Sequence, residues 1–360
     1  MFGDQLEELR EFLRQPNGTK EVNVVVMPDF FLDRLISVNM DVTAFSRLTK
    51  GVAERKGGSI DGIRQVELRG GNAVNTASAL AGLNAKVTPI VCTSQIGLQL
   101  IKLYLQSSKS DFSHIKVFGK TSITTAIEFE TGNGKTNVML RDIGALARFG
   151  PHHLSKEDFE IIEDADYVCV FNWAGTRFFG TELAETVFSR VKDRGRGKTY
   201  YDTADPTPNK EGIPKLVKRV LENKLVDILS VNENEAFCYA SQLSDEAREL
   251  RKSLKFGESA KECARILASH LSARIDLHTT SYSASFTRKS EVVVPAFNVP
   301  ILRATGAGDA WNAGNILGYH HGLPDDCRLS LANAVAAYYI SNREGFHPTQ
   351  KQLTRFCQKL

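Results

Sequence analysis

The sequence predicts an α/β fold: a doubly wound, mainly parallel central sheet flanked by helices, with a small β-sheet lid. Short continuous apolar runs such as Val22–Met27 and Tyr167–Phe171 are typical of strands that helices cover on both faces. Helical patterns separate most of these runs, and this alternation indicates parallel strands joined by crossover helices. A chain of 360 residues, 42% of them hydrophobic, is long enough for two domains or for one large α/β domain with an insertion.

The chain opens with apolar residues at helical spacing, Leu6, Leu9, Phe12 and Leu13, and this pattern ends at Pro16-Asn17-Gly18. Residues 1–20 are therefore expected to form an N-terminal helical extension. After the first strand, further strands are predicted at Val87–Val91, Tyr167–Phe171, Thr199–Tyr201, Val226–Val231 and Arg274–His278. The last part of the chain predicts helices at Ala307–His321, Asp325–Ser341 and near Gln350.

Two stretches, 36–69 and 121–141, interrupt this rhythm because they lack long helical periodicity. Within the second, residues 122–130 and 135–140 flank a polar, glycine-containing turn, as the two strands of a β-hairpin do. We expect these two stretches to form the lid. The α/β core would then comprise residues 21–35, 70–120 and 142–360.

The charge and composition of the chain argue against several classes of function. A formal net charge of +3 is too small to indicate a nucleic-acid groove or a polybasic membrane surface. No apolar run approaches the ~18 residues of a membrane span, and no signal peptide follows Met1, so a cytoplasmic protein is expected. The six cysteines contain no C-x-x-C pair, which favours free, buried thiols over a metal site.

A glycine-rich turn near the C-terminus has the features of an anion site. Its sequence is Gly306-Ala307-Gly308-Asp309, and it opens the helix predicted from Ala307. Small residues let backbone N–H groups approach a ligand, and a helix N-terminus favours a phosphoryl group. The Asp309 carboxylate would repel a bound phosphate but could take the proton from an attacking hydroxyl, as a general base does. The tetrapeptide alone fits a capped tight turn equally well.

A second junction of small residues, Gly70-Gly71-Asn72-Ala73-Val74-Asn75, precedes a predicted helix. Carboxamides donate and accept hydrogen bonds without charge, so they suit a polyhydroxy ligand better than a phosphate. Asp33 follows the first strand, where its carboxylate could hold two neighbouring hydroxyls. Taken alone, each of these features is also typical of an ordinary turn, helix cap or loop residue.

Together the two glycine motifs resemble those of the ribokinase-like, or phosphofructokinase-B, family of carbohydrate and nucleoside kinases. The pattern Gly70-Gly71-x-Ala73-x-Asn75-x-Ala77 is similar to the first family signature, and Gly306-Ala307-Gly308-Asp309 to the second. The resemblance covers about residues 22–350. It implies transfer of a nucleotide phosphoryl group to a hydroxyl, with Asp309 as base and Gly306, Ala307 and Gly308 as the anion hole. It also implies a substrate site between sheet and lid, formed by Asp33, Gly70, Gly71 and Asn75.

The resemblance extends to the nucleotide side. Asn232-Glu233-Asn234-Glu235 matches the family N-x-x-E motif, which implies that Asn232 and Glu235 organise Mg²⁺ and its waters, Glu235 through water. Asn333 matches a helix position beside the nucleotide base. Where the family usually has T-x-G-x-x-G, this chain has Thr279 and Ser281 but no glycine. Their hydroxyls could bind phosphate, and the changed loop leaves ADP open as a donor besides ATP.

Two arginines stand out against the family pattern. Arg303 lies where members often have an aspartate that helps hold a monovalent cation, so we expect a fixed positive charge there. Arg141, after the second lid strand, would clamp the acceptor by bidentate pairing if the acceptor bears a phosphate. The alternative is an ion pair between Arg141 and Asp142 or Glu128.

We therefore predict a carbohydrate kinase that uses ATP and Mg²⁺ and phosphorylates a sugar or sugar-like polyol. A nucleoside kinase of the same family and a catalytically weak ligand-sensing protein are the alternatives. A dinucleotide-dependent oxidoreductase is disfavoured because no G-x-G-x-x-G follows the first strand. No nucleic-acid or membrane partner is expected, whereas the open edge of the lid could pair with a second copy in a homodimer.

Overall fold

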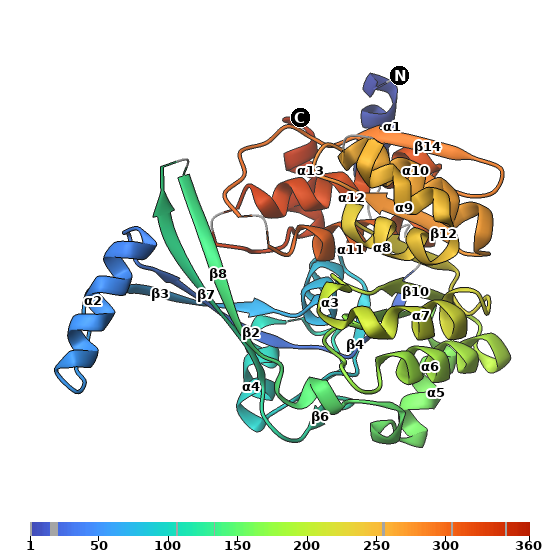
Figure 1. Cartoon of the computed structure of the whole chain (residues 1–360). Helices are drawn as coiled ribbons and strands as arrows, with labels where there is room; N and C mark the ends of the chain where they lie inside the picture. The colour runs from blue at the N-terminus through green and yellow to red at the C-terminus, as the bar shows by residue number, and fades with distance from the viewer. Residues whose placement is uncertain are drawn as a thin grey trace.

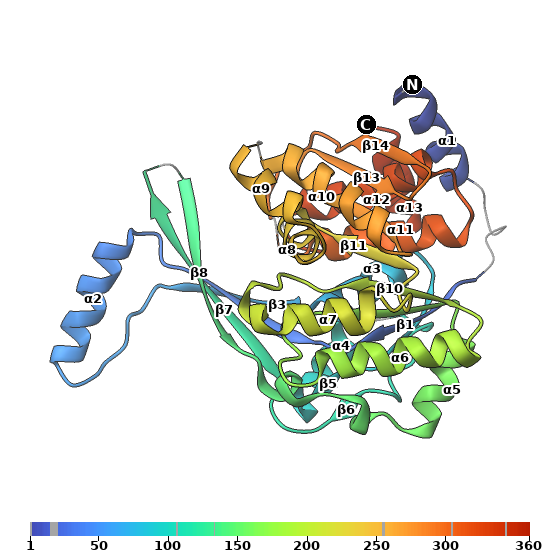
Figure 2. The ribbon, with the colours of Figure 1, turned by 45° about the vertical axis from the view of Figure 1, so that its right-hand side comes forward.

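The computed structural model describes residues 2–14, 21–105, 107–132, 134–253, 256–303, 305–342 and 344–360. These residues form an α/β core with a four-stranded sheet projecting from one side (Figure 1, Figure 2). The predicted fold class is confirmed.

The central sheet has eight strands in the order β14-β13-β12-β11-β10-β9-β1-β4. The six strands from β4 to β12 run parallel, and β13 and β14 add an antiparallel edge. Their bounds are β1 (Asn23–Met27), β4 (Lys86–Pro89), β9 (Tyr167–Phe171), β10 (Lys198–Asp202), β11 (Ile228–Val231), β12 (Arg274–His278), β13 (Tyr282–Phe286) and β14 (Glu291–Pro295). Each strand expected in the core is present.

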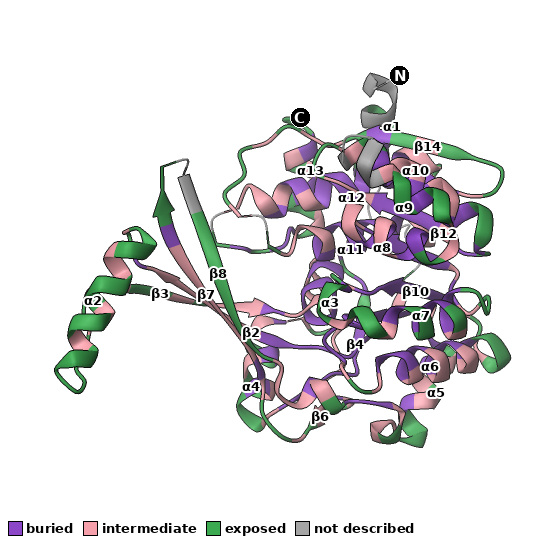
Figure 3. Ribbon diagram, viewed as in Figure 1, coloured by how far each residue is buried: buried purple, intermediate pink, exposed green. Residues whose placement is uncertain are grey.

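Alternate residues of the central strands pack against two separate layers of helices. Val24 and Val26 of β1 join the core with α3 (Asn72–Gly82), α11 (Ala307–His320) and α12 (Asp325–Ile340). Val25 and Met27 join the opposite layer, with α5 (Lys156–Asp164), α6 (Gly180–Arg194), α8 (Glu233–Leu243) and α10 (Phe256–His270). The central strands are accordingly buried along most of their length (Figure 3).

The remaining elements connect or extend these layers. They are α4 (Gln95–Tyr104), α7 (Ile213–Leu216), α9 (Asp245–Ser253), α13 (Gln350–Cys357), the short pair β5 (Cys92–Thr93) and β6 (Lys116–Val117), 3₁₀ turns at Gly144–Arg148, Pro151–His153 and Thr207–Gly212, and a π-turn at Val217–Leu221. The six cysteines, all in described parts of the chain, form no disulfide bond, and all except the half-buried Cys238 are buried. In the described parts of the chain, no helix has the length and apolar character of a membrane span.

The expected N-terminal extension contains a helix, α1 (Phe2–Arg14), that packs on the core. Its side chains Leu9 and Leu13 are buried against the α12 side of the molecule, and Arg10 Nε donates to the backbone oxygen of Cys357 at 3.1 Å. The rest of the expected extension, residues 1 and 15–20, lies outside the described residues.

The lid sheet has the order β3-β2-β7-β8, formed by β2 (Phe31–Ser37), β3 (Arg64–Gly70), β7 (Ser122–Thr131) and β8 (Gly134–Asp142). It begins at Phe31, earlier than the expected residue 36, so Asp33 lies on a lid strand and not in a core loop. The hairpin of β7 and β8 matches the prediction, although residue 133 at its turn lies outside the described residues.

The first lid stretch contains a helix that we did not expect, α2 (Val42–Glu54). Asp41 caps it by accepting a hydrogen bond from the backbone N–H of Ala44 at 2.8 Å. No residue of α2 is buried, and it lies at the outer end of the lid, away from the core (Figure 1, Figure 3). It contacts the sheet through the edge-on pair Phe45 and Phe129, whose ring centroids are 5.7 Å apart.

Candidate active site

A cavity of about 410 Å³ lies between the lid sheet and the core. Asp33 on β2 and Arg141 on β8 line it from the lid, and Asn75 on α3 lines it from the core. Gly306 and Asp309, at the start of α11, complete the wall. The structure thus brings the two glycine motifs, 237 residues apart between Asn72 and Asp309, to one place.

Asp309 is buried, 5% exposed, and two amides hold its carboxylate. Asn72 Nδ2 donates to Oδ1 at 2.8 Å, and Asn75 Nδ2 donates to Oδ2 at 2.9 Å. Burial raises the pKa of Asp309 to about 7, and the amide hydrogen bonds oppose this rise. A carboxyl group with a pKa near neutrality, in a cavity wall, is well suited to accept a proton.

Asp33 is the second carboxylate of the cavity, and it lies opposite Thr124 of β7 in the lid register. Burial raises the pKa of Asp33 to about 6, while the hydrogen bond with Thr124 and the charge of Arg141 favour its ionised form. The Asp33 carboxylate can therefore accept further hydrogen bonds from a substrate bound in this cavity.

Two glycines make the acceptor side of the cavity possible: Gly70 leaves room for the Asp33 carboxylate, and Gly71 allows a close backbone approach. A Cβ on Gly70 would overlap the carboxylate of Asp33. Gly71 has φ of +90°, and a Cβ there would lie 2.9 Å from the Cα of Phe30. Both glycines therefore shape the acceptor side of the cavity by the absence of a side chain.

The junction before α3 has a capping arrangement that the sequence did not reveal. Gly71 has no side chain to cap the helix, so Asp29, after β1, accepts from the backbone N–H groups of Asn72 and Ala73 at 2.9 Å each. Asn172 Nδ2 also donates to Asp29, at 2.8 Å. This cap leaves the Asn72 side chain available for Asp309.

The position of Asn75 is fixed from behind by Arg69. Arg69 Nε donates to Asn75 Oδ1 at 3.0 Å, while the amide nitrogen of Asn75 donates to Asp309. Asn75 therefore holds the base as well as lining the acceptor cavity. Neither Arg69 nor Asn72 was among the predicted site residues.

The turn before α11 has the geometry of an anion hole. Gly306 has φ of +88°, in the left-handed region, and a Cβ there would lie 2.6 Å from the hydroxyl of Tyr339. Ala307 and Gly308 follow as the first residues of the helix, whose leading N–H groups have no partner within the helix. A Cβ on Gly308 would lie 3.1 Å from the imidazole of His278.

His278, at the end of β12, is a residue that sequence reasoning missed. Its Nε2 is buried and has no hydrogen-bond partner among the described residues. The ring lies 5.1 Å from that of Trp311, and burial lowers the pKa of His278 below its ordinary value. A neutral imidazole with an unused nitrogen thus lies against the glycine turn.

Asn232 and Glu235 form a capping box at the start of α8. Asn232 Oδ1 accepts from the backbone N–H groups of Asn234 and Glu235, and Glu235 accepts from the backbone and amide nitrogens of Asn232. Burial raises the pKa of Glu235 well above its ordinary value, and Asp202 adds to this rise. Asp202 also raises the pKa of Asp309, so its charge acts on both groups.

These acidic side chains fit a hydrated cation better than a directly bound one. Asp205 and Glu233 also raise the pKa of Glu235, so positive charge nearby would offset several carboxylates at once. Among the described residues, no group of three or more His, Cys, Asp or Glu side chains is arranged to hold a metal directly.

The other predicted nucleotide residues lie farther along the same sheet edge. Thr279 Oγ1 donates to the backbone oxygen of Tyr282 at 2.7 Å and closes the β12–β13 turn. Ser281 is exposed and lines a separate hollow of about 420 Å³ against α10. Asn333 is buried, where its Oδ1 accepts from Ser283 and Trp311.

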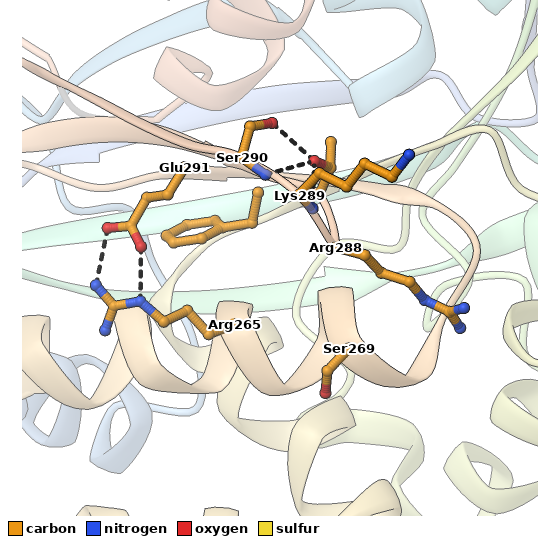
Figure 4. Close-up of a pocket in the computed structure, with 8 residues that line it drawn as sticks. Arg265, Ser269, Arg288, Lys289, Ser290 and Glu291 are labelled. Atoms are coloured by element: carbon orange, nitrogen blue, oxygen red, sulfur yellow. Dashed lines mark hydrogen bonds and ion pairs between the residues drawn. The ribbon is translucent and has the colours of Figure 1, made fainter.

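A third hollow, of about 630 Å³, lies where the turn from β13 to β14 passes α10 (Figure 4). Its Arg265 donates to both carboxylate oxygens of Glu291, at 2.7 and 2.8 Å (Figure 4). None of the predicted site residues lines it, so it is separate from the site at Asp309.

The sequence profile of the pfkB family of carbohydrate kinases matches residues 36–352. A search of curated protein sequences gave no match. Among solved structures, ribokinase of Arabidopsis thaliana with ribose and ATP is similar, with a TM-score of 0.69, 17% identity, and coverage of 94% of this chain and 99% of that one.

Two other solved structures have the same fold. Ribokinase of Cryptococcus neoformans with ADP has a TM-score of 0.69 and 16% identity over 95% of this chain and 100% of that one. Adenosine kinase of Sinorhizobium meliloti has a TM-score of 0.68 and 17% identity over 94% and 99%. On the profile match and this shared ribokinase-like fold, the chain belongs to the pfkB family of carbohydrate kinases.

Proposed function

We propose that this kinase transfers the terminal phosphoryl group of a nucleotide to a hydroxyl of a sugar or sugar-like polyol. The observation that carries the proposal is the buried Asp309 carboxylate, held by Asn72 and Asn75 beside the glycine turn at the start of α11. Asp309 takes the proton of the attacking hydroxyl. The N–H groups of the Gly306–Gly308 turn stabilise the negative charge on the phosphoryl group as it is transferred.

The acceptor would occupy the cavity under the lid. Asp33 accepts hydrogen bonds from neighbouring hydroxyls, and Gly70 and Gly71 let the sugar approach the backbone. Asn75 contributes to the same wall, and Arg141 faces it from β8. Closure of the lid over the cavity excludes water, which would otherwise compete with the acceptor hydroxyl.

The nucleotide would lie beyond Asp309, along the carboxyl ends of β10, β11 and β12. Asn232 and Glu235 would hold the waters of Mg²⁺, and the ion would neutralise charge on the phosphate oxygens. His278 Nε2, unpartnered and against Gly308, donates to a phosphate oxygen. The Thr279 and Ser281 turn and Asn333 border the rest of the nucleotide. ATP is the expected donor, and ADP is the alternative because the turn lacks glycine.

The proposal is tested by measuring phosphoryl transfer from ATP, and then from ADP, to sugars, polyols, sugar phosphates and nucleosides. Turnover of one sugar-type acceptor supports it. Turnover of nucleosides alone would favour the second candidate, a nucleoside kinase, for which the fold similarity to adenosine kinase is the supporting observation. If a sugar or nucleotide raises the melting temperature and no acceptor is phosphorylated, the chain is a ligand-sensing protein instead.

We also propose that two copies pair through the lid. Strand β8 is an open edge of the lid sheet, and its Val138, Met139 and Leu140 are exposed by 48%, 48% and 56%. An exposed apolar edge strand is a favourable surface for pairing with another chain.

A further inference from the structure

We infer that the acceptor carries an anionic group, a phosphate or a carboxylate, which Arg141 and Arg303 bind from opposite walls of the cavity. This inference rests on the proposed function and names the substrate class of the same site. Arg141 belongs to β8 of the lid, and Arg303 to the core loop that precedes the glycine turn. Both line the cavity that also contains Asp33 and Asp309.

Arg141 is exposed, and its N–H donors have no partner among the described residues. It pairs with Thr124 in the lid register, and its guanidinium lies 5.1 Å from the centre of the Phe31 ring. Among the described residues it forms no hydrogen bond and has no carboxylate within 4.0 Å. The expected alternative, an ion pair with Asp142 or Glu128, is not formed. Its five N–H donors are therefore available to a ligand.

Arg303 is held in place without having its donors satisfied. Its guanidinium lies 4.9 Å from the centre of the Tyr339 ring, and a side chain at Gly345 would overlap it. Its Nε is buried and has no hydrogen-bond partner among the described residues. A buried charged donor without a partner is unfavourable, so a ligand that accepts from Arg303 would stabilise this arrangement.

The other two arginines near this cavity have partners. Arg34 lines the same cavity, but its Nη2 forms an ion pair with Glu67 at 2.5 Å. Arg69 donates to Asn75 and to the backbone oxygen of Gly345. Arg34 and Arg69 therefore have hydrogen-bonded partners in the protein. Arg141 and Arg303 act on Asp33 only through their charge, so their N–H donors remain for a ligand.

Asp33 offsets part of this positive charge, but no protein group in the described part of the chain accepts from the two guanidinium groups. A phosphate or carboxylate can pair with both by charge-assisted hydrogen bonds, which are stronger than those to neutral hydroxyls. The acceptor would then present a hydroxyl to Asp309 and its anionic group to the two arginines. Such an acceptor differs from the ribose bound to the Arabidopsis thaliana ribokinase and from the adenosine for which the Sinorhizobium meliloti kinase is named.

The test compares matched acceptors: a hexose with its 6-phosphate, a pentose with its 5-phosphate, and an aldose with its aldonate. Each is assayed for kcat/KM with the unmodified chain, Arg141→Gln and Arg303→Gln. We expect kcat/KM for one charged acceptor to exceed that of its neutral parent at least 100-fold. Each glutamine variant should lower kcat/KM for the charged acceptor at least tenfold more than for the parent, mainly through KM. Comparing the sugar phosphates with the aldonate shows whether the site binds a phosphate or a carboxylate.

Arg34→Gln is the matched control, because it removes the same charge from the same cavity at an arginine already paired with Glu67. The Arg34→Gln variant should change kcat/KM by the same factor for the charged and the neutral acceptor. A melting-temperature assay with the same acceptors measures binding independently of transfer, and also reports whether each variant folds.

The outcomes separate the two proposals. Equal or better turnover of the neutral sugar, or equal losses on both acceptors in Arg141→Gln and Arg303→Gln, would overturn the anion site and leave the kinase. Binding of a sugar phosphate that depends on both arginines, without any phosphoryl transfer, would overturn the kinase and leave the anion site. Neither binding nor transfer of any charged or neutral sugar would overturn both.

Discussion

Asp309 combines burial with two amide donors and a neighbouring carboxylate, Asp202, and this combination sets its chemistry. Burial favours the protonated form, and the hydrogen bonds from Asn72 and Asn75 favour the ionised form. The resulting pKa of about 7 leaves the group divided between its two forms at neutral pH. A base of this kind is ionised often enough to act and basic enough to take a proton.

These pKa values predict the pH dependence of kcat/KM. Asp309 must be ionised to accept a proton, so kcat/KM should rise with pH to a plateau above about 7 and fall about tenfold per unit below it. Asp33, with a pKa of about 6, adds a second, lower inflection. The Asp33→Asn variant should keep the upper inflection and lose the lower one. A flat profile between pH 5 and pH 8 would contradict the assignment of Asp309.

Site residues that a local backbone conformation requires could be predicted from the sequence. Site residues that only the packing of distant segments brings together could not. Gly306 and Gly71 both have positive φ, as expected of glycines at loop–helix junctions. Asp202 and His278 end two strands without any motif, and only the packing of β10 and β12 beside α11 gives them a place near the site.

At the scale of elements, the missed helix α2 shows where the sequence pattern was ambiguous. Val42, Phe45 and Leu48 do repeat at helical spacing, and Asp41 is a good N-cap. The segment is short and contains Gly51, and it buries no residue, so neither length nor packing supports it. Its position between two lid strands also made an all-β lid the simpler interpretation.

A buried ion pair joins helix α12 to strand β12 across the core. Arg328 Nη1 and Asp276 Oδ2 are 3.0 Å apart, with side chains 1% and 0% exposed. Arg328→Met would leave the Asp276 carboxylate buried without its cation, so we expect a loss of about 3–5 kcal/mol in the free energy of unfolding. Urea unfolding followed by two probes measures this loss.

The exposed pair of Arg248 and Asp245 provides the control, with side chains 57% and 91% exposed. Arg248→Met should lower the free energy of unfolding by no more than about 1 kcal/mol, because water already solvates both charges. Equal losses in Arg328→Met and Arg248→Met would show that the α12–β12 pair contributes nothing particular to the core.

At the scale of the whole molecule, strand β8 of the lid contributes to both the acceptor cavity and the proposed homodimer interface. Side chains alternate along β8, so Val138 and Leu140 point away from the face of Met139, which lines the cavity. We expect sedimentation equilibrium to give twice the 39.8 kDa mass of one chain. The double variant Val138→Lys and Leu140→Lys should give the mass of one chain. A single-chain mass for the unmodified protein would contradict pairing through the lid.

The site as a whole depends on Asp309, and its replacement is the most direct test. The Asp309→Asn variant keeps the size and planarity of the side chain but loses its basicity. For the acceptor that the unmodified chain phosphorylates, we expect kcat to fall by about 10² or more while the acceptor and nucleotide still raise the melting temperature. A variant that binds both ligands and turns over at the unmodified rate would show that Asp309 is not the base.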